Sequence, residues 1–192
     1  MPVINDRFAS LAPPPIKTNI SRMPHAFQSY KPRFMKVFGA ICVNSKGEVL
    51  LVHGRKSKKW SFAKGHCHDG ETDLQCALRE LNEETGLELE GKYSSYHKLR
   101  GGGYFIFPVD DDLEIKPSDH WEIDKVAWWP LRSLPILNSN VDVSIFRTLM
   151  KSMKGEPEDA LEFLESPQAK KKMNTIKHCI DCSTPTAPAI VN

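Results

Sequence analysis

The stretch GHCHDGETDLQCALRELNEETGL, residues 65–87, decides the fold of this 192-residue chain. Thr72 is a typical helix N-cap, and Gln75 three residues later completes a capping-box pattern. Gly86 supplies a C-terminal stop, because glycine readily adopts the left-handed conformation that ends helices. The stretch therefore predicts a helix from about Thr72 to Thr85. Three leucines recur at helical spacing and should face a core: Leu74, Leu78 and Leu81.

The same helix carries three carboxylates. Glu80, Glu83 and Glu84 are three and four positions apart, which places them on one helix face. Their repulsion weakens an isolated helix by roughly a few tenths of a kcal/mol per pair, whereas a hard cation such as Mg²⁺ reverses that effect. Such a cation can bridge and polarise a polyphosphate. We expect Arg79 to pair with Glu83 or with Glu71. The alternative is a solvated, charged helix face.

The full spacing of this stretch is more specific than the carboxylates alone. It matches Gly-x5-Glu-x7-Arg-Glu-U-x-Glu-Glu-x-Gly-U, where U is apolar, at all nine specified positions. This pattern resembles the signature of the Nudix hydrolase family. The resemblance implies an α/β/α sandwich and the hydrolysis of a nucleoside diphosphate linked to another moiety, with Mg²⁺ or Mn²⁺. A non-catalytic binding module with this fold is the alternative from another functional class.

The resemblance also assigns residues. It implies metal binding by Glu80, Glu83 and Glu84, joined by a backbone carbonyl near Lys64-Gly65. We therefore expect Glu83 and Glu84 to be catalytic, together with Arg79, which would fix a glutamate rotamer.

The sequence on both sides of the helix predicts strands. The order of strands, helix, strands and helix favours an α/β fold with a mixed sheet between helices. A turn at residues 44–47 makes the first two apolar runs a hairpin. We expect strands near 34–43, 49–52, 60–62, 104–109 and 125–129, a helix over about 141–153, and a shorter helix after Pro157.

Length and composition predict the domain organisation. Residues 1–33, with three consecutive prolines at 13–15, are expected to be an arm, and residues 34–154 to be the Nudix domain. Residues 155–192 are expected to be a helical and basic tail, disordered from Ser183 onward. No apolar run approaches the roughly 20 residues that a membrane span needs, so no membrane partner is expected. Five irregularly spaced cysteines and no export signal favour a reducing compartment, the cytoplasm, with the nucleus as the alternative.

The flanks of the helix point to a substrate. Residues 30–41, 49–65 and 121–135 resemble the catalytic domain of the mRNA-decapping enzyme family. That resemblance implies cleavage of the cap triphosphate to 7-methyl-GDP and 5′-monophosphate RNA. Glu122 would be a further carboxylate that activates water, and Lys64 would approach the phosphates. Lys64-Gly65-His66 is also similar to asymmetric diadenosine tetraphosphate hydrolases, so small dinucleoside polyphosphates or diphosphoinositol phosphates are the alternative substrates.

Other side chains are candidates for substrate and RNA contacts. Trp121, beside Glu122, is the best candidate for a ring that faces the site, and Tyr104 is a weaker one. A basic helix face could bind the RNA backbone, with a solvated face as the alternative. Its residues are Arg147, Lys151 and Lys154, at i, i+4 and i+7 spacing. A zinc site built from the cysteines and histidines near residues 66–68 and 178–182 is a minor alternative.

Overall fold

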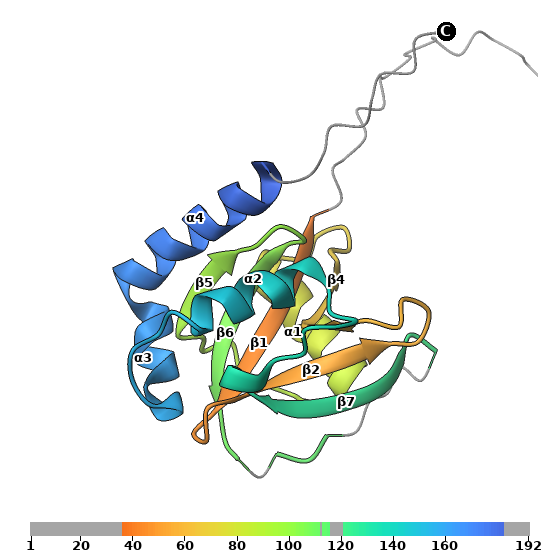
Figure 1. The fold of residues 1–192 in the computed structure, drawn as a ribbon. Coiled ribbons are helices and arrows are strands. Elements are labelled where there is room, and N and C mark those ends of the chain that lie inside the picture. The colour runs from red at the N-terminus through yellow and green to blue at the C-terminus, as the bar shows by residue number, and fades with distance from the viewer. Residues whose placement is uncertain (1–35, 112, 116–120, 183–192) are drawn as a thin grey trace, which may run out of the picture. The chain divides into compact units, whose positions relative to one another are not determined.

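The computed structural model describes residues 36–111, 113–115 and 121–182. Within these residues, helices pack on both faces of one mixed sheet (Figure 1). This arrangement confirms the predicted α/β sandwich. The predicted arm, residues 1–33, and the end predicted to be disordered, residues 183–192, lie outside the described part of the chain.

The sheet is built around β1 (Val37–Asn44), which is buried from its second residue to its last. It pairs antiparallel with β2 (Glu48–Gly54) and β4 (Ala63–His66), and parallel with β6 (Gly103–Val109). The predicted hairpin is thus confirmed, and β1 is buried because helices cover both faces of the sheet. The remaining strands are β3 (Trp60–Ser61) and β7 (Ile123–Pro130), which pair with β2, and β5 (Ser95–Lys98), which pairs with β6.

Helix α1 (Asp73–Thr85) covers one face of the sheet. Its ends are as predicted: the Thr72 side chain accepts a hydrogen bond from the backbone of Gln75, and Gly86 ends the helix at φ 76°. The helix buries its apolar side against a cluster that includes Phe105 and Phe107. Leu81 is buried in this cluster, while Leu74 and Leu78 pack against it partly exposed. The apolar spacing therefore fixes which side of α1 faces outward.

Three helices cover the other face: α2 (Val141–Met150), α3 (Ala160–Glu165) and α4 (Pro167–Cys182). Phe146, Leu164 and Met173, one from each helix, lie in one hydrophobic cluster with strand residues such as Ile41. Residues 157–179 of the predicted tail therefore pack on the same core as the domain before them. The predicted helix after Pro157 is present, the tail that was predicted to be helical contains the longer α4, and α2 ends three residues before the predicted Met153. Two short 3-10 helices lie at Leu131–Ser133 and Pro157–Asp159.

None of the helices in the described residues has the length and apolar content needed to cross a membrane.

Strand β4 connects the sheet to the glutamate-bearing helix α1. Gly39 of β1 pairs with Lys64 of β4, and a Cβ on Gly39 would clash with the Ala63 carbonyl and the Lys64 side chain. Glycine therefore lets the two strands approach closely. This packing fixes Lys64 and Gly65 beside α1, with which β4 makes extensive contact.

Candidate active site

A cavity of about 610 Å³ opens between β4, α1 and the start of β7. Most of the residues predicted for catalysis, metal binding and phosphate binding line it. They are Lys64, Gly65, Arg79, Glu80, Glu83, Glu84 and Glu122.

Glu84 carries the strongest electrostatic constraint in this cavity. Burial raises its pKa to about 8, and the charges of Glu80 and Glu122 raise it as well. The backbone N–H of Lys64 donates to Glu84 Oε2 at 3.1 Å and partly offsets these effects. The carboxyl group therefore holds a proton at neutral pH unless a positive charge is brought beside it.

Glu80 is held between Gly65 and Arg79. A Cβ on Gly65 would clash with the Glu80 carboxyl group, so the glycine of the motif provides the space in which that group lies. Burial raises the pKa of Glu80, while the hydrogen bond from Arg79 lowers it and the charges of Glu83 and Glu122 raise it. The glutamate side of α1 is thus partly closed by β4 rather than fully solvated.

Arg79 organises the carboxylates around it. Its Nε donates to Glu71 Oε1 at 2.6 Å, and its Nη2 donates to Glu71 Oε2 at 3.1 Å. Its Nη1 donates to Glu80 Oε1 at 2.8 Å and to Glu83 Oε2 at 3.0 Å. Both pairings that the sequence left open are therefore present. The Arg79 guanidinium lowers the pKa of Glu71 to about 2.

Lys64 and Glu122 face Glu84 from the other side. These three residues also line an adjoining cavity of about 230 Å³. The backbone N–H of Arg55 donates to the Glu122 carbonyl at 2.7 Å, which fixes the start of β7 against the loop after β2. Lys56 and Ser57 of that loop line the adjoining cavity as well, and no role was predicted for them. The basic run at residues 55–59 was the available signal, but it does not show which of its side chains faces a site.

Two predicted substrate contacts lie elsewhere. Tyr104 has no exposed surface, and its hydroxyl donates to Asp142 Oδ2 at 2.6 Å. Its ring packs on Phe62 in the core, so the prediction that Tyr104 contacts substrate is corrected here to a structural role. Trp121 adjoins Glu122 in sequence but is 86% exposed and does not line the cavity.

The three predicted RNA-binding residues lie on α2 and just after it, and none lines the carboxylate cavity. Arg147 and Lys151 line a separate cavity of about 750 Å³ together with Trp60 and Trp129. The Nε and Nη1 atoms of Arg147 are buried and have no hydrogen-bond partner among the described residues. Lys154 is exposed. The expected basic face is therefore divided: Arg147 and Lys151 line the separate cavity, and Lys154 lies on the open surface.

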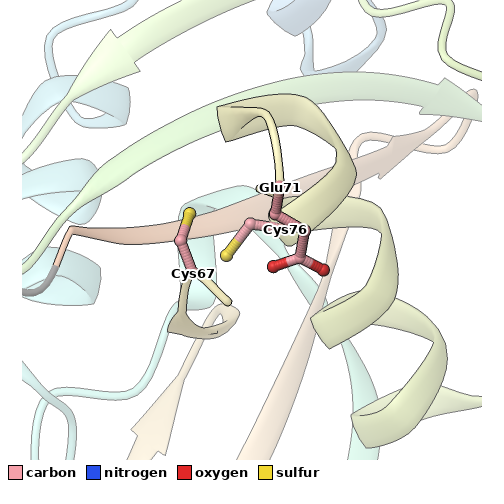
Figure 2. Close-up of side chains that lie close together, drawn as sticks. All are labelled: Cys67, Glu71 and Cys76. Atoms are coloured by element: carbon pink, nitrogen blue, oxygen red, sulfur yellow. The ribbon is translucent and has the colours of Figure 1, made fainter. Parts of the chain in front are cut away.

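A second group of possible ligand atoms lies beside the carboxylates. Cys67, Glu71 and Cys76 point toward one another, with all three ligand atoms within 4.8 Å of each other (Figure 2). Cys67 and Glu71 are partly exposed and Cys76 is buried. This trio differs from the predicted zinc combination, because it pairs Cys67 with two residues not considered and includes neither His178 nor Cys179.

The carboxylate cavity fits a hard divalent cation. Glu80, Glu83 and Glu84 supply oxygen ligands, which Mg²⁺ and Mn²⁺ prefer, and the Gly65 backbone lies directly against Glu80. A buried carboxyl group with a raised pKa gains most from such a charge. The residues that would hold the ion are therefore the three glutamates, with the backbone near Gly65.

Comparisons with known proteins give a family match and several similar proteins. A family model described as NUDIX domain matches residues 33–149. The mRNA-decapping enzyme subunit 2 of Saccharomyces cerevisiae (strain YJM789) is 29% identical over 137 residues, which are 66% of this chain and only 14% of that protein. An RNA pyrophosphohydrolase of Pseudoalteromonas translucida (strain TAC 125) is 38% identical over 142 residues, 59% of this chain and 80% of that protein. A solved Ap4A hydrolase of C. elegans aligns with a TM-score of 0.44 and 16% identity, over 77% of this chain and 99% of that one.

Replacing Glu84 by glutamine should stabilise the metal-free protein at high pH. The folded pKa of about 8 lies above the usual glutamate pKa of 4.5, so the folded protein keeps a proton that the unfolded chain loses. The free energy of unfolding of the wild type should therefore fall as pH rises from about 4.5 to about 8. Glutamine cannot ionise and can still accept from Lys64, so the variant should be more stable at pH 8 by about 1–4 kcal/mol.

Urea denaturation in the presence of a chelator, at several pH values between about 5 and 8, measures this difference in the free energy of unfolding. The matched control is Glu88→Gln, because Glu88 is exposed just beyond the helix. A Glu84→Gln advantage that does not grow with pH would show that the burial of Glu84 has been misjudged.

Proposed function

Because the matched model covers more than half of its residues, the chain belongs to the Nudix family, and we propose that it hydrolyses the 5′ cap of mRNA. The products would be 7-methyl-GDP and 5′-monophosphate RNA. Family membership alone supports the coarser statement that the chain is a phosphoanhydride hydrolase. The cap as substrate is the finer claim, and it depends on the residues around the carboxylates.

The cation that we propose, Mg²⁺ or Mn²⁺, would neutralise and polarise the phosphates when it is bound. The chain's own groups then have separate tasks. Lys64 lines both cavities and would orient a phosphate oxygen by its positive charge. Glu122 lies opposite, close enough to Glu80 and Glu84 to raise their pKa values, and would accept the proton of the attacking water. Arg79 would position Glu80 and Glu83 through its hydrogen bonds.

One observation carries the cap proposal: Glu122 faces the same cavity as Lys64 and the three metal-binding glutamates. The resemblance to decapping enzymes pointed to Glu122 because it precedes an apolar strand. In the fold this residue lines the carboxylate cavity although it is far from α1 in the sequence. The similarity to the decapping subunit covers 66% of this chain. A cytoplasmic location remains part of the proposal.

The second candidate is hydrolysis of another polyphosphate. Similarity to a protein named RNA pyrophosphohydrolase, over 80% of its length, favours RNA with an uncapped 5′ polyphosphate. The small dinucleoside and inositol substrates are less well supported, because they depend on the Lys64-Gly65-His66 pattern alone.

We further propose that RNA crosses the surface near the end of α2. Lys151 and Lys154 are exposed there, and Arg147 extends the positive charge into the separate cavity of about 750 Å³. RNA at this surface would distinguish a capped transcript from a small nucleotide, because only the transcript reaches beyond the carboxylate cavity.

The substrate assignment can be tested by offering four substrates side by side with Mg²⁺ or Mn²⁺. These are capped RNA, 5′-triphosphate RNA, diadenosine tetraphosphate and diphosphoinositol pentakisphosphate. We expect release of 7-methyl-GDP from capped RNA, at a rate at least about 100-fold lower for Glu83→Gln with Glu84→Gln, because ligand loss removes charge stabilisation of the transition state. Chromatography of the released nucleotides measures the outcome.

In that assay the control is Glu88→Gln, which changes an exposed glutamate outside the cavity. Turnover of the small substrates or of triphosphate RNA, with capped RNA untouched, would contradict cap hydrolysis while leaving the Nudix chemistry intact. Equal inactivity of the wild type and the double variant on all four would contradict the enzyme proposal itself.

The RNA surface makes a separate prediction. Reversing the charges of Lys151 and Lys154 to glutamate should weaken RNA binding at least about tenfold at low salt, with a smaller loss at high salt, because these residues would contact phosphates. Fluorescence anisotropy with a labelled RNA measures the affinity. Lys92→Glu is the control, because Lys92 is 90% exposed on the loop after α1. Affinity unchanged by the double reversal would exclude this surface.

A further inference from the structure

Two thiols and a carboxylate converge where the loop after β4 meets the first turn of α1 (Figure 2). Cys67 follows β4 directly, Glu71 precedes the helix cap, and Cys76 lies on the helix. Their two Sγ atoms and a carboxylate oxygen all lie within 4.8 Å of one another. The trio adjoins the carboxylate cavity, which Cys67 also lines, but two of its three donor atoms are sulfur.

The spacing is close to that of a zinc site. Tetrahedral zinc, with Zn–S near 2.3 Å and Zn–O near 2.0–2.2 Å, holds its donors about 3.5–3.8 Å apart. Donors that already lie within 4.8 Å need shifts of about 1 Å to reach this geometry. Cys67 can supply such a shift, because it lies in a loop and is partly exposed. Cys76 and Glu71 are placed by the start of the helix.

We propose that Cys67, Glu71 and Cys76 bind a thiophilic divalent cation, zinc, at a site distinct from the hard-cation site of Glu80, Glu83 and Glu84. The ligands would be the two Sγ atoms and one Glu71 oxygen, with a fourth position open to water. Each thiol releases one proton as it binds, and nothing is oxidised. Thiolates select zinc, whereas carboxylates suit Mg²⁺ and Mn²⁺, so the two sites differ in the metal that they favour.

Arg79 couples the two sites. Both Glu71 oxygens accept hydrogen bonds from Arg79, and the same guanidinium donates to Glu80 and Glu83. Zinc on Glu71 removes part of that pairing, so more of the Arg79 charge is left to Glu80 and Glu83. Zinc occupancy therefore lowers the affinity of the neighbouring carboxylates for Mn²⁺, and by linkage Mn²⁺ lowers the affinity for zinc.

Cobalt provides the direct test, because thiolate ligands give Co²⁺ an intense near-ultraviolet charge-transfer band that carboxylate ligands do not give. The titration uses reduced full-length protein carrying Cys179→Ser and Cys182→Ser, so that the thiols near the end of the chain make no contribution. We expect one equivalent of Co²⁺ to develop the band, zinc to abolish it, and excess Mg²⁺ to leave it unchanged. In calorimetry, Cys67→Ser should weaken zinc binding at least tenfold.

The matched control is Cys42→Ser, because Cys42 is buried in β1 and takes no part in the trio. Absence of the band, or its persistence at full intensity in Cys67→Ser, would overturn the site. The coupling predicts that saturating zinc weakens Mn²⁺ binding several-fold in the wild type and not in Cys67→Ser. Equal effects in both would overturn the coupling. None of these readouts uses a nucleotide substrate, so failure of the cap proposal would leave them unaffected.

Discussion

The buried carboxyl group of Glu84 is the constraint on which the rest of the site depends. Burial raises its pKa to about 8, and two neighbouring glutamates add to the electrostatic cost of ionising it. A cluster of this kind destabilises the folded protein at neutral pH unless positive charge compensates it. Arg79 compensates Glu71, Glu80 and Glu83 through hydrogen bonds, whereas the backbone N–H and the charge of Lys64 only partly offset the cost at Glu84. A divalent cation bound beside Glu84 would supply such a charge.

The sequence was sufficient to predict the helix and the face on which its glutamates lie. The capping box, the terminal glycine and the glutamate spacing are local features, so α1 and its outward face were predicted correctly. Two properties of the same residues are not local. Glu84 is partly buried against β4, and Gly65 is required because Glu80 lies against it. Both depend on strand pairing between residues far apart in the chain.

The mistaken predictions have the same origin. Tyr104 was a candidate for an aromatic ring that faces the substrate, but its hydroxyl donates to Asp142 of α2 in the core. The basic stretch after residue 167 suggested a tail, yet Ala169 and Met173 on the same helix are buried. A long helix that alternates apolar and charged residues can either pack on a core or stay exposed. Helix α4 packs because α2 lies against it. The run of lysines at residues 170–172 therefore predicted that their side chains are exposed, but not that the helix carrying them packs on the core.

The central claim is that the Glu84 face of α1 holds a hard cation, and Mn²⁺ binding measured by electron paramagnetic resonance tests it most directly. The signal of free Mn²⁺ falls as the ion binds, so no substrate is needed. The account predicts binding by the wild type, competition by Mg²⁺, and at least tenfold weaker binding by Glu84→Gln, with Glu88→Gln unchanged. Equal Mn²⁺ affinity in the wild type and Glu84→Gln would contradict the account.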